Sequence, residues 1–118
     1  RTRRYWRSPG RAAVRELAII RKSFRVNGDP NALAVALSIF LRRCVLAKFP
    51  PQDVAGLTGI AWLEFLDRTG KTREFTAGPG RVLISAPYQA CASIQADQLL
   101  CVIAAWIEHA LSTEESAS

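Results

Sequence analysis

Apolar residues recur at helical spacing between residues 9 and 26 of this 118-residue chain. Four of them, three or four positions apart, define one helix face: Ala13, Leu17, Ile20 and Phe24. The opposite face carries four cations: Arg11, Arg15, Lys22 and Arg25. Ser8-Pro9 supplies an N-cap before a first-turn proline, and Asn27-Gly28 favours a left-handed end. The pattern predicts an amphipathic helix with a basic outer stripe.

The segment 31–49 is apolar on almost every side, which is typical of a central helix in a bundle. Asp29-Pro30 repeats the start signal, and Pro50-Pro51 ends the helix. Its length of about 18 residues suits a membrane span, but Arg42-Arg43 argues against one. No run of 18 residues is uninterrupted by polar groups. We therefore expect no transmembrane helix here, and we place Arg42-Arg43 on a solvated face.

The next part of the chain predicts short elements. PQDVAG suits a single helical turn, and Thr58 suits the N-cap of a helix that ends at Arg68 and is closed by Thr69-Gly70. That helix has an apolar and a charged face: Trp62, Leu63 and Leu66 on one, Glu64, Asp67 and Arg68 on the other. A loop follows over 71–81, with a candidate short β-arm at 73–76.

Gly78-Pro79-Gly80 breaks any strand, and Pro79 can begin a short helix that ends at Ser85. GPGR lacks the spacing of known phosphate-binding loops, so turn chemistry explains its glycines. The last helix is expected from Ala96 to Leu111, with a core stripe of Leu99, Ile103, Trp106 and Ala110. The sum is an all-α bundle of about five helices. We divide the chain into a basic segment 1–8, a helical domain 9–111 and a disordered tail 112–118.

Positive charge is concentrated at one end of the chain. Residues 1–25 hold nine basic residues and one acidic residue, while the remaining 93 hold seven basic and nine acidic. The net charge is therefore +8 in the first part and −2 in the rest. A nucleic-acid-binding surface more often spreads its charge over the domain.

The first residues allow two interpretations. In a nucleic-acid arm, arginines would neutralise phosphates while the aromatic rings stack on bases. In a juxtamembrane segment, arginines would lie at anionic headgroups and the aromatics in the interfacial belt. The absence of methionine, even at position 1, suggests a fragment of a longer protein, and with the charge asymmetry it favours the second interpretation. The membrane-proximal residues would be Arg1, Arg3, Arg4, Tyr5, Trp6 and Arg7.

Few residues indicate catalytic or metal chemistry. Cys44, Cys91 and Cys101 have no CxxC spacing and, with the single histidine, do not form a credible zinc set. We expect them to be free buried thiols in a reducing compartment. His109 is expected at a helix end, and the carboxylates form no paired inward-facing motif. The sequence thus predicts no enzyme, no cofactor and no metal.

The motif GIAWLEFLD at 59–67 is followed by Phe75, Gly78-Pro79-Gly80 and Ala86-Pro87-Tyr88. Upstream, a helix pair leads to Leu41-Arg42-Arg43 and Phe49-Pro50. Over residues 11–110 this order resembles the bacterial family catalogued as domain of unknown function 4381. The resemblance implies a small inner-membrane protein with one span before an arginine-rich stretch and a helical domain. It supplies no catalytic residues. It implies structural roles for Trp62, Leu63, Phe65 and Leu66, and for Asp67 as a cap or an ion-pair partner of arginine.

The resemblance also implies partners, because the family tends to be encoded beside MoxR-type AAA+ ATPases and von Willebrand factor A-domain membrane proteins. The charge near residue 1 would hold this domain on the cytoplasmic side of the bacterial inner membrane. We expect a non-enzymatic interaction or adaptor module that contacts its partner through Arg11, Arg15, Lys22 and Arg25 or through the loop 71–81. The alternative is a small basic nucleic-acid-binding helical domain.

Overall fold

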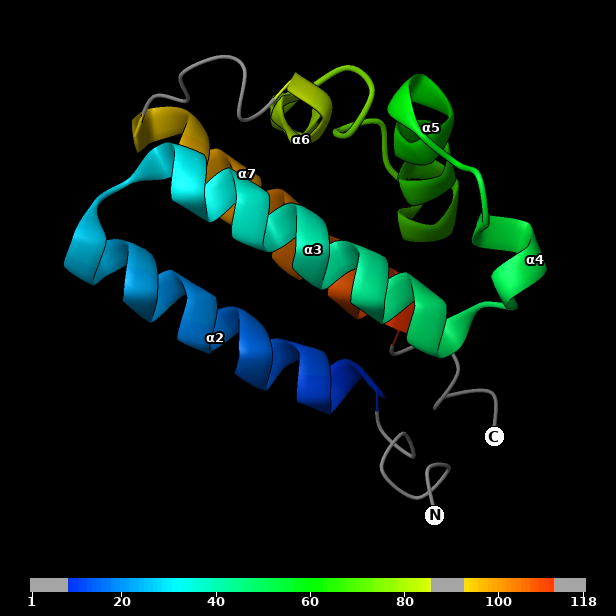
Figure 1. Cartoon of the computed structure of the whole chain (residues 1–118), viewed down its shortest axis with the longest axis horizontal. Helices are drawn as coiled ribbons and strands as arrows, with labels where there is room; N and C mark the ends of the chain where they lie inside the picture. Colours follow the sequence, from blue (N-terminus) through cyan, green and yellow to red (C-terminus); the bar gives the residue numbers. More distant parts are fainter. Residues whose placement is uncertain (1–8, 86–92, 112–118) are drawn as a thin grey trace.

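Two long antiparallel helices form one side of the molecule, α2 (Pro9–Asn27) and α3 (Pro30–Lys48) (Figure 1). The computed structural model describes residues 9–85 and 93–111. Both helix bounds agree with the prediction. Gly28 adopts the left-handed φ of +64° that the tight connection requires. Asp29 then caps α3, because its Oδ1 accepts hydrogen bonds from the amides of Asn31 and Ala32.

Several sequence predictions lie outside the described residues. These are the Ser8 N-cap, Cys91, the motif Ala86-Pro87-Tyr88, the segments 1–8 and 112–118, and with them the membrane-proximal residues Arg1, Arg3, Arg4, Tyr5, Trp6 and Arg7. They stay predictions.

Helix α3 is the central element, since it packs against α2, α4, α6 and α7. Six of its residues are buried: Leu33, Ala34, Leu37, Phe40, Leu41 and Val45. By length and composition alone α3 is apolar enough to cross a membrane, although no more than 33% of its most apolar stretch is buried in the bundle. Such a helix is compatible with membrane anchoring, and the core helix of a bundle has the same length and composition. The expectation that no transmembrane helix lies here stays a prediction. Packing in the bundle accounts for only part of its apolar surface.

Helix α4 (Pro51–Val54) is the predicted single turn, and α5 (Gly59–Gly70) follows it. Thr58 stands at the N-cap of α5, but its side chain makes no capping hydrogen bond. The helix continues two residues beyond Arg68 and ends where Lys71 takes a left-handed φ of 56°. Gly70 can stay inside the helix because it packs against an indole: a Cβ there would lie 2.6 Å from Trp106 Cδ1.

The predicted β-arm at 73–76 is wrong, because these residues form turns. Their amides bond to the side chain of Asp67 in place of a neighbouring strand. A 3₁₀ turn, η1 (Pro79–Arg81), and helix α6 (Val82–Ser85) follow, as the Pro79 start signal predicts.

Helix α7 (Ser93–Trp106) lies behind α3 and continues into a wider π turn, η2 (Ile107–Leu111) (Figure 1). It begins three residues before the predicted start at Ala96. Its predicted core stripe is buried: Leu99, Ile103, Trp106 and Ala110. The two described ranges contain helices and turns but no strand. The prediction of a small all-α bundle is confirmed.

Candidate functional site

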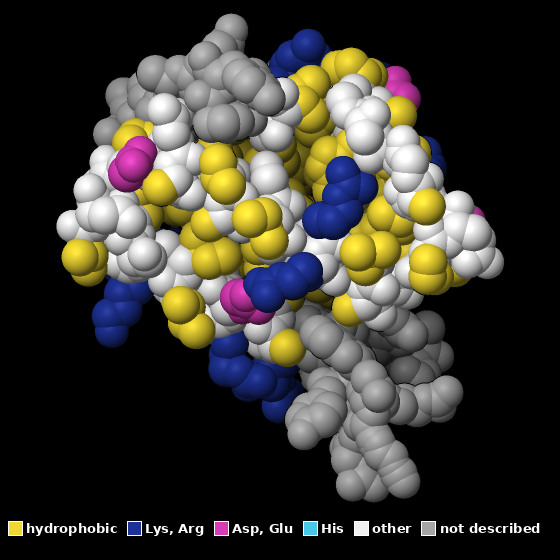
Figure 2. Space-filling model, viewed as in Figure 1, with side chains coloured by type: hydrophobic (Ala, Val, Ile, Leu, Met, Phe, Trp, Pro, Cys, Tyr) yellow, Lys and Arg dark blue, Asp and Glu magenta, His cyan; other side chains and the backbone are white. Residues whose placement is uncertain are grey.

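The outward face of α2 is both basic and apolar. All four predicted contact cations are exposed: Arg11, Arg15, Lys22 and Arg25. Three large apolar side chains lie among or beside them and are also exposed, Val14 at 57%, Ile19 at 68% and Val26 at 83%. The opposite stripe of α2 packs on α3, α7 and η2. In Figure 2, Lys and Arg side chains project from the edge that α2 forms.

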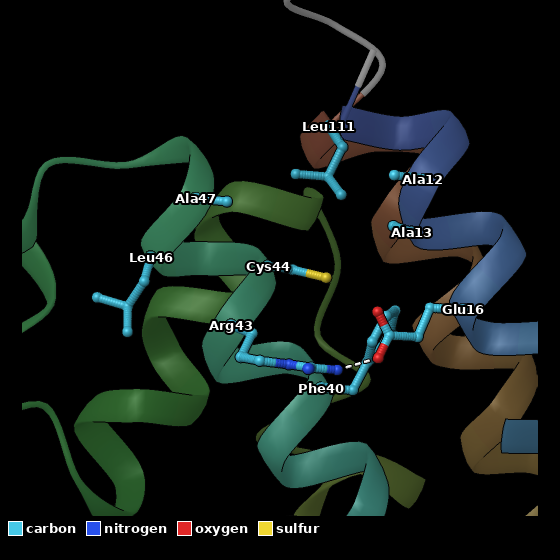
Figure 3. A pocket seen from close by; sticks show the side chains of 9 residues that line it. All are labelled: Ala12, Ala13, Glu16, Phe40, Arg43, Cys44, Leu46, Ala47 and Leu111. Carbon is cyan, nitrogen blue, oxygen red and sulfur yellow. Dashed lines mark hydrogen bonds and ion pairs between the residues drawn. The ribbon is translucent and has the colours of Figure 1, made fainter. Parts of the chain in front are cut away.

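A cleft of about 400 Å³ separates α2 from the C-terminal half of α3 (Figure 3). Its lining is mostly apolar: Ala12, Ala13, Phe40, Leu46, Ala47 and Leu111. The carboxylate of Glu16 on α2 and the guanidinium of Arg43 on α3 form an ion pair across it. The Arg43 side chain is 60% exposed and that of Glu16 44%, so solvent screens the pair and it adds little to stability.

Cys44 lies in the same cleft, half-buried on α3. Burial, together with the nearby charge of Glu16, raises the pKa of its thiol to about 12, against a small opposing effect of Arg43. Cys44 is thus a neutral thiol at physiological pH. Cys101, in contrast, is exposed on α7. The prediction of buried free thiols is wrong for Cys101, because its position on α7 falls outside the buried stripe of that helix.

The two thiols should differ sharply in reactivity, because only the thiolate is nucleophilic. At pH 8 we expect iodoacetamide to alkylate Cys44 on the order of 100-fold more slowly than Cys101 in the folded protein. Peptide mapping by mass spectrometry over a time course measures both rates. In guanidinium chloride the two rates should converge. Equal rates in the folded protein would contradict the assigned environment of Cys44.

A second, more open cleft of about 500 Å³ lies between α3, α5 and α6. Trp62 and Leu83 line it, and Arg42 spans it: the guanidinium carbon lies 4.0 Å from the centre of the Trp62 ring. Arg42 Nη2 also donates a 3.1 Å hydrogen bond to the carbonyl oxygen of Leu57. The prediction that both arginines are solvated is therefore wrong for Arg42, which is half-buried by its cation–π contact, and holds for Arg43.

Asp67 organises the loop between α5 and η1. Its carboxylate accepts hydrogen bonds from the Phe75 amide (2.9 Å), the Thr76 amide (3.2 Å) and the Thr76 hydroxyl (2.6 Å). Phe75 is fully buried, and a Cβ at Gly80 would lie 2.7 Å from Phe75 Cα. These contacts anchor the loop onto α5; they neither cap a helix end nor pair with an arginine, so they differ from both roles that the resemblance implies for Asp67. The loop is a fixed platform whose exposed cations are Lys71, Arg73 and Arg81.

No three His, Cys, Asp or Glu side chains within the described part of the chain are grouped so that they could hold a metal ion. His109 lies exposed in the last turn, η2. The predominant features of the described residues are thus surfaces and clefts.

Comparison with known proteins identifies the family of the chain. A family model described as "Domain of unknown function (DUF4381)" matches residues 1–109. The chain belongs to the DUF4381 family. No curated protein and no solved structure matches it.

The most specific motif of this DUF4381 domain lies in its core. Four motif residues on α5 are at most 5% exposed, and Trp106 on α7, which packs against the end of α5, is 1% exposed: Trp62, Leu63, Phe65, Leu66 and Trp106. The rings of Trp62 and Phe65 stack with centroids 6.2 Å apart, and Phe49 meets Phe65 edge-on at 5.3 Å. The motif thus explains how α5 is held on the bundle.

Sequence reasoning on this DUF4381 domain missed the roles of Arg43, Cys44 and Ile39. They line the clefts beside α3, and their contacts come from helices distant in sequence. The one available signal was the near-uniform apolarity of 31–49, which exceeds what one buried face needs. The predicted contact cations of α2 and of loop 71–81 are exposed, and none of them lines either cleft. Helix α2 forms one wall of the first cleft through other residues, Ala12, Ala13 and Glu16.

Proposed function

We propose that this DUF4381 domain is a non-enzymatic interaction module of a membrane-anchored bacterial protein. It acts as an adaptor that binds a MoxR-type AAA+ ATPase, a von Willebrand factor A-domain membrane protein, or both. The observation that carries the proposal is the outward face of α2, where four cations and three large apolar side chains are exposed to solvent.

Such a face suits recognition better than it suits water. Arginine and exposed aliphatic side chains are typical of protein interfaces, whereas a purely solvated helix face carries few large apolar groups. Glu16 is the one acidic residue of α2, and it pairs with Arg43 on the inner side of the helix. The outer face is therefore uniformly positive and fits an acidic partner surface. The loop 71–81 offers a second, smaller set of exposed cations.

Charge also supports the proposed location. Nine basic residues within the first 25 favour the cytoplasmic side of the inner membrane for this end of the chain. A span upstream of residue 1 would then place α2 close to the membrane surface, within reach of a cytosolic ATPase. Cys44 and Cys101 are free thiols, which suits a reducing compartment.

Charge reversal on α2 tests the proposed contact. The double change Arg15→Glu, Lys22→Glu should abolish co-purification with the ATPase or the A-domain protein, because acidic groups would face an acidic partner surface. Both side chains are exposed, so helicity measured by circular dichroism should not change. Unaltered co-purification would refute the α2 contact, and Lys71→Glu, Arg73→Glu would then test the loop.

A charge-matched pair of variants separates a specific contact from net charge. Arg15→Gln, Lys22→Gln and Gln98→Glu, Ala105→Glu each lower the net charge by two, but the second pair lies on exposed positions of α7. Only the first pair should weaken binding. The nucleic-acid alternative predicts duplex DNA binding in fluorescence polarisation, with a steep salt dependence that persists after deletion of residues 1–10. That result would replace the adaptor proposal.

A further inference from the structure

The exposed face of α3 is apolar, in a helix that the bundle buries on its other side. Six residues of α3 are exposed, and five of them are apolar: Ala32, Val35, Ile39, Arg43, Leu46 and Ala47. The large ones are exposed by 38% at Val35, 57% at Ile39 and 47% at Leu46. A helix face that meets only water normally carries polar residues. Figure 2 shows hydrophobic side chains spread over the face formed by α2 and α3, with a small number of Lys, Arg, Asp and Glu side chains between them.

This face forms a ridge between the two clefts. Ile39, Arg43 and Leu46 follow one another at spacings of four and three, so they line up along one side of α3. Ile39 borders the cleft of about 500 Å³ towards α5, and Leu46 borders the cleft of about 400 Å³ towards α2. Arg43 lines both. A ridge with a hollow on each side can receive the projecting side chains of another helix.

We propose that this ridge docks an amphipathic helix of the partner protein, with apolar residues for the two clefts and at least one carboxylate for Arg43 or Arg42. The inference rests on the proposed adaptor function and names the chemistry of the partner segment. Charge complementarity selects an acidic helix, because the two clefts contain two guanidinium groups and one carboxylate, Glu16. Glu16 and Arg43 form a solvent-screened pair, and a partner carboxylate can share the remaining donors of Arg43.

The same features argue against a bilayer as the occupant. Arg43 stands in the middle of the apolar ridge with 60% of its side chain exposed, so contact with lipid tails would place a cation in hydrocarbon. A smooth bilayer surface would also leave the two clefts unfilled. A helix with a carboxylate satisfies the arginine and fills the clefts at once.

The test measures the affinity of the purified domain for the purified MoxR-type ATPase and the purified A-domain protein by isothermal titration calorimetry. The double change Ile39→Gln, Leu46→Gln should weaken binding about tenfold, and Arg43→Glu should do the same. Ile60→Gln on α5 is the matched control. Ile60 is 43% exposed, a fraction similar to the 47% of Leu46, and it lines neither cleft. It should leave affinity unchanged, and all variants should keep the thermal midpoint of the wild type.

The outcomes separate this inference from the proposed function. Wild-type protein that binds neither partner would refute the adaptor function itself. Wild-type binding that is lost in Arg15→Glu, Lys22→Glu but unchanged in Ile39→Gln, Leu46→Gln would keep the adaptor and overturn the ridge. Flotation with phosphatidylglycerol vesicles provides the third arm. If the ridge variant loses vesicle binding and keeps full affinity for the protein partners, a bilayer covers this face and the inference is wrong.

Discussion

Replacement of Trp106 by alanine is expected to lower the free energy of unfolding by about 4 kcal/mol. Trp106 is 1% exposed and stands where α7 passes into η2. Its ring lies so close to Gly70 that no Cβ fits between them, and its Nε1 donates a 2.9 Å hydrogen bond to the hydroxyl of Thr69. Loss of the indole would leave a large cavity and remove the main contact between the end of α5 and the last helix.

Urea unfolding followed by circular dichroism measures this loss. Trp106→Phe keeps much of the ring but removes the N–H donor, so it should cost less, about 1–2 kcal/mol. Thr69→Val removes the acceptor, and its double-mutant cycle with Trp106→Phe should give the energy of the hydrogen bond. A Trp106→Ala protein within 1 kcal/mol of wild type would show that the α5–α7 contact is not where the bundle gains its stability.

Asp67→Ala is expected to cost about 3 kcal/mol, the second largest effect. The carboxylate accepts three hydrogen bonds, two from backbone amides and one from the Thr76 hydroxyl. Both amides donate to this carboxylate, so alanine would remove their acceptor beside the buried Phe75 ring. The loop 71–81 would then lose its fixed shape before the bundle unfolds.

Hydrogen exchange at the amides of Phe75 and Thr76 measures this local effect directly. Both amides should exchange much faster in Asp67→Ala than in wild type, while amides in the middle of α3 keep their protection. Glu64→Ala is the matched control, because Glu64 is an exposed carboxylate one turn earlier on the same helix. If Asp67→Ala and Glu64→Ala behave alike, Asp67 does not organise the loop.

The helices that could be read from the sequence are those whose ends are defined by local chemistry. Pro9 and Asn27-Gly28 bound α2, and Asp29-Pro30 and Pro50 bound α3, because caps and prolines act within a few residues of the helix end. The β-arm at 73–76 failed for the complementary reason. The amides of Phe75 and Thr76 bond to Asp67, a side chain eight and nine residues earlier, which no strand propensity can indicate.

The candidate site divides in the same way. The exposed cations of α2 were predictable, because an amphipathic pattern with a packed apolar stripe leaves the opposite stripe in water. The role of Arg42 was not, since its cation–π contact is with Trp62, twenty positions away on another helix. Nor could the sequence show that Arg43 and not Arg42 would be the solvated arginine, because adjacent residues on a helix differ by about 100° in direction.

The sequence by itself therefore determined the helical class, the bounds of the long helices and the basic stripe of α2. It also determined that the apolar residues of the α5 motif are buried. These depend on periodicity and capping, which are local. Only the tertiary structure decided which part of the apolar α3 is covered, because burial depends on which helices pack beside it. That packing left Ile39, Arg43 and Leu46 as an uncovered ridge between two clefts, in a helix whose composition alone could not distinguish its buried side from its exposed one.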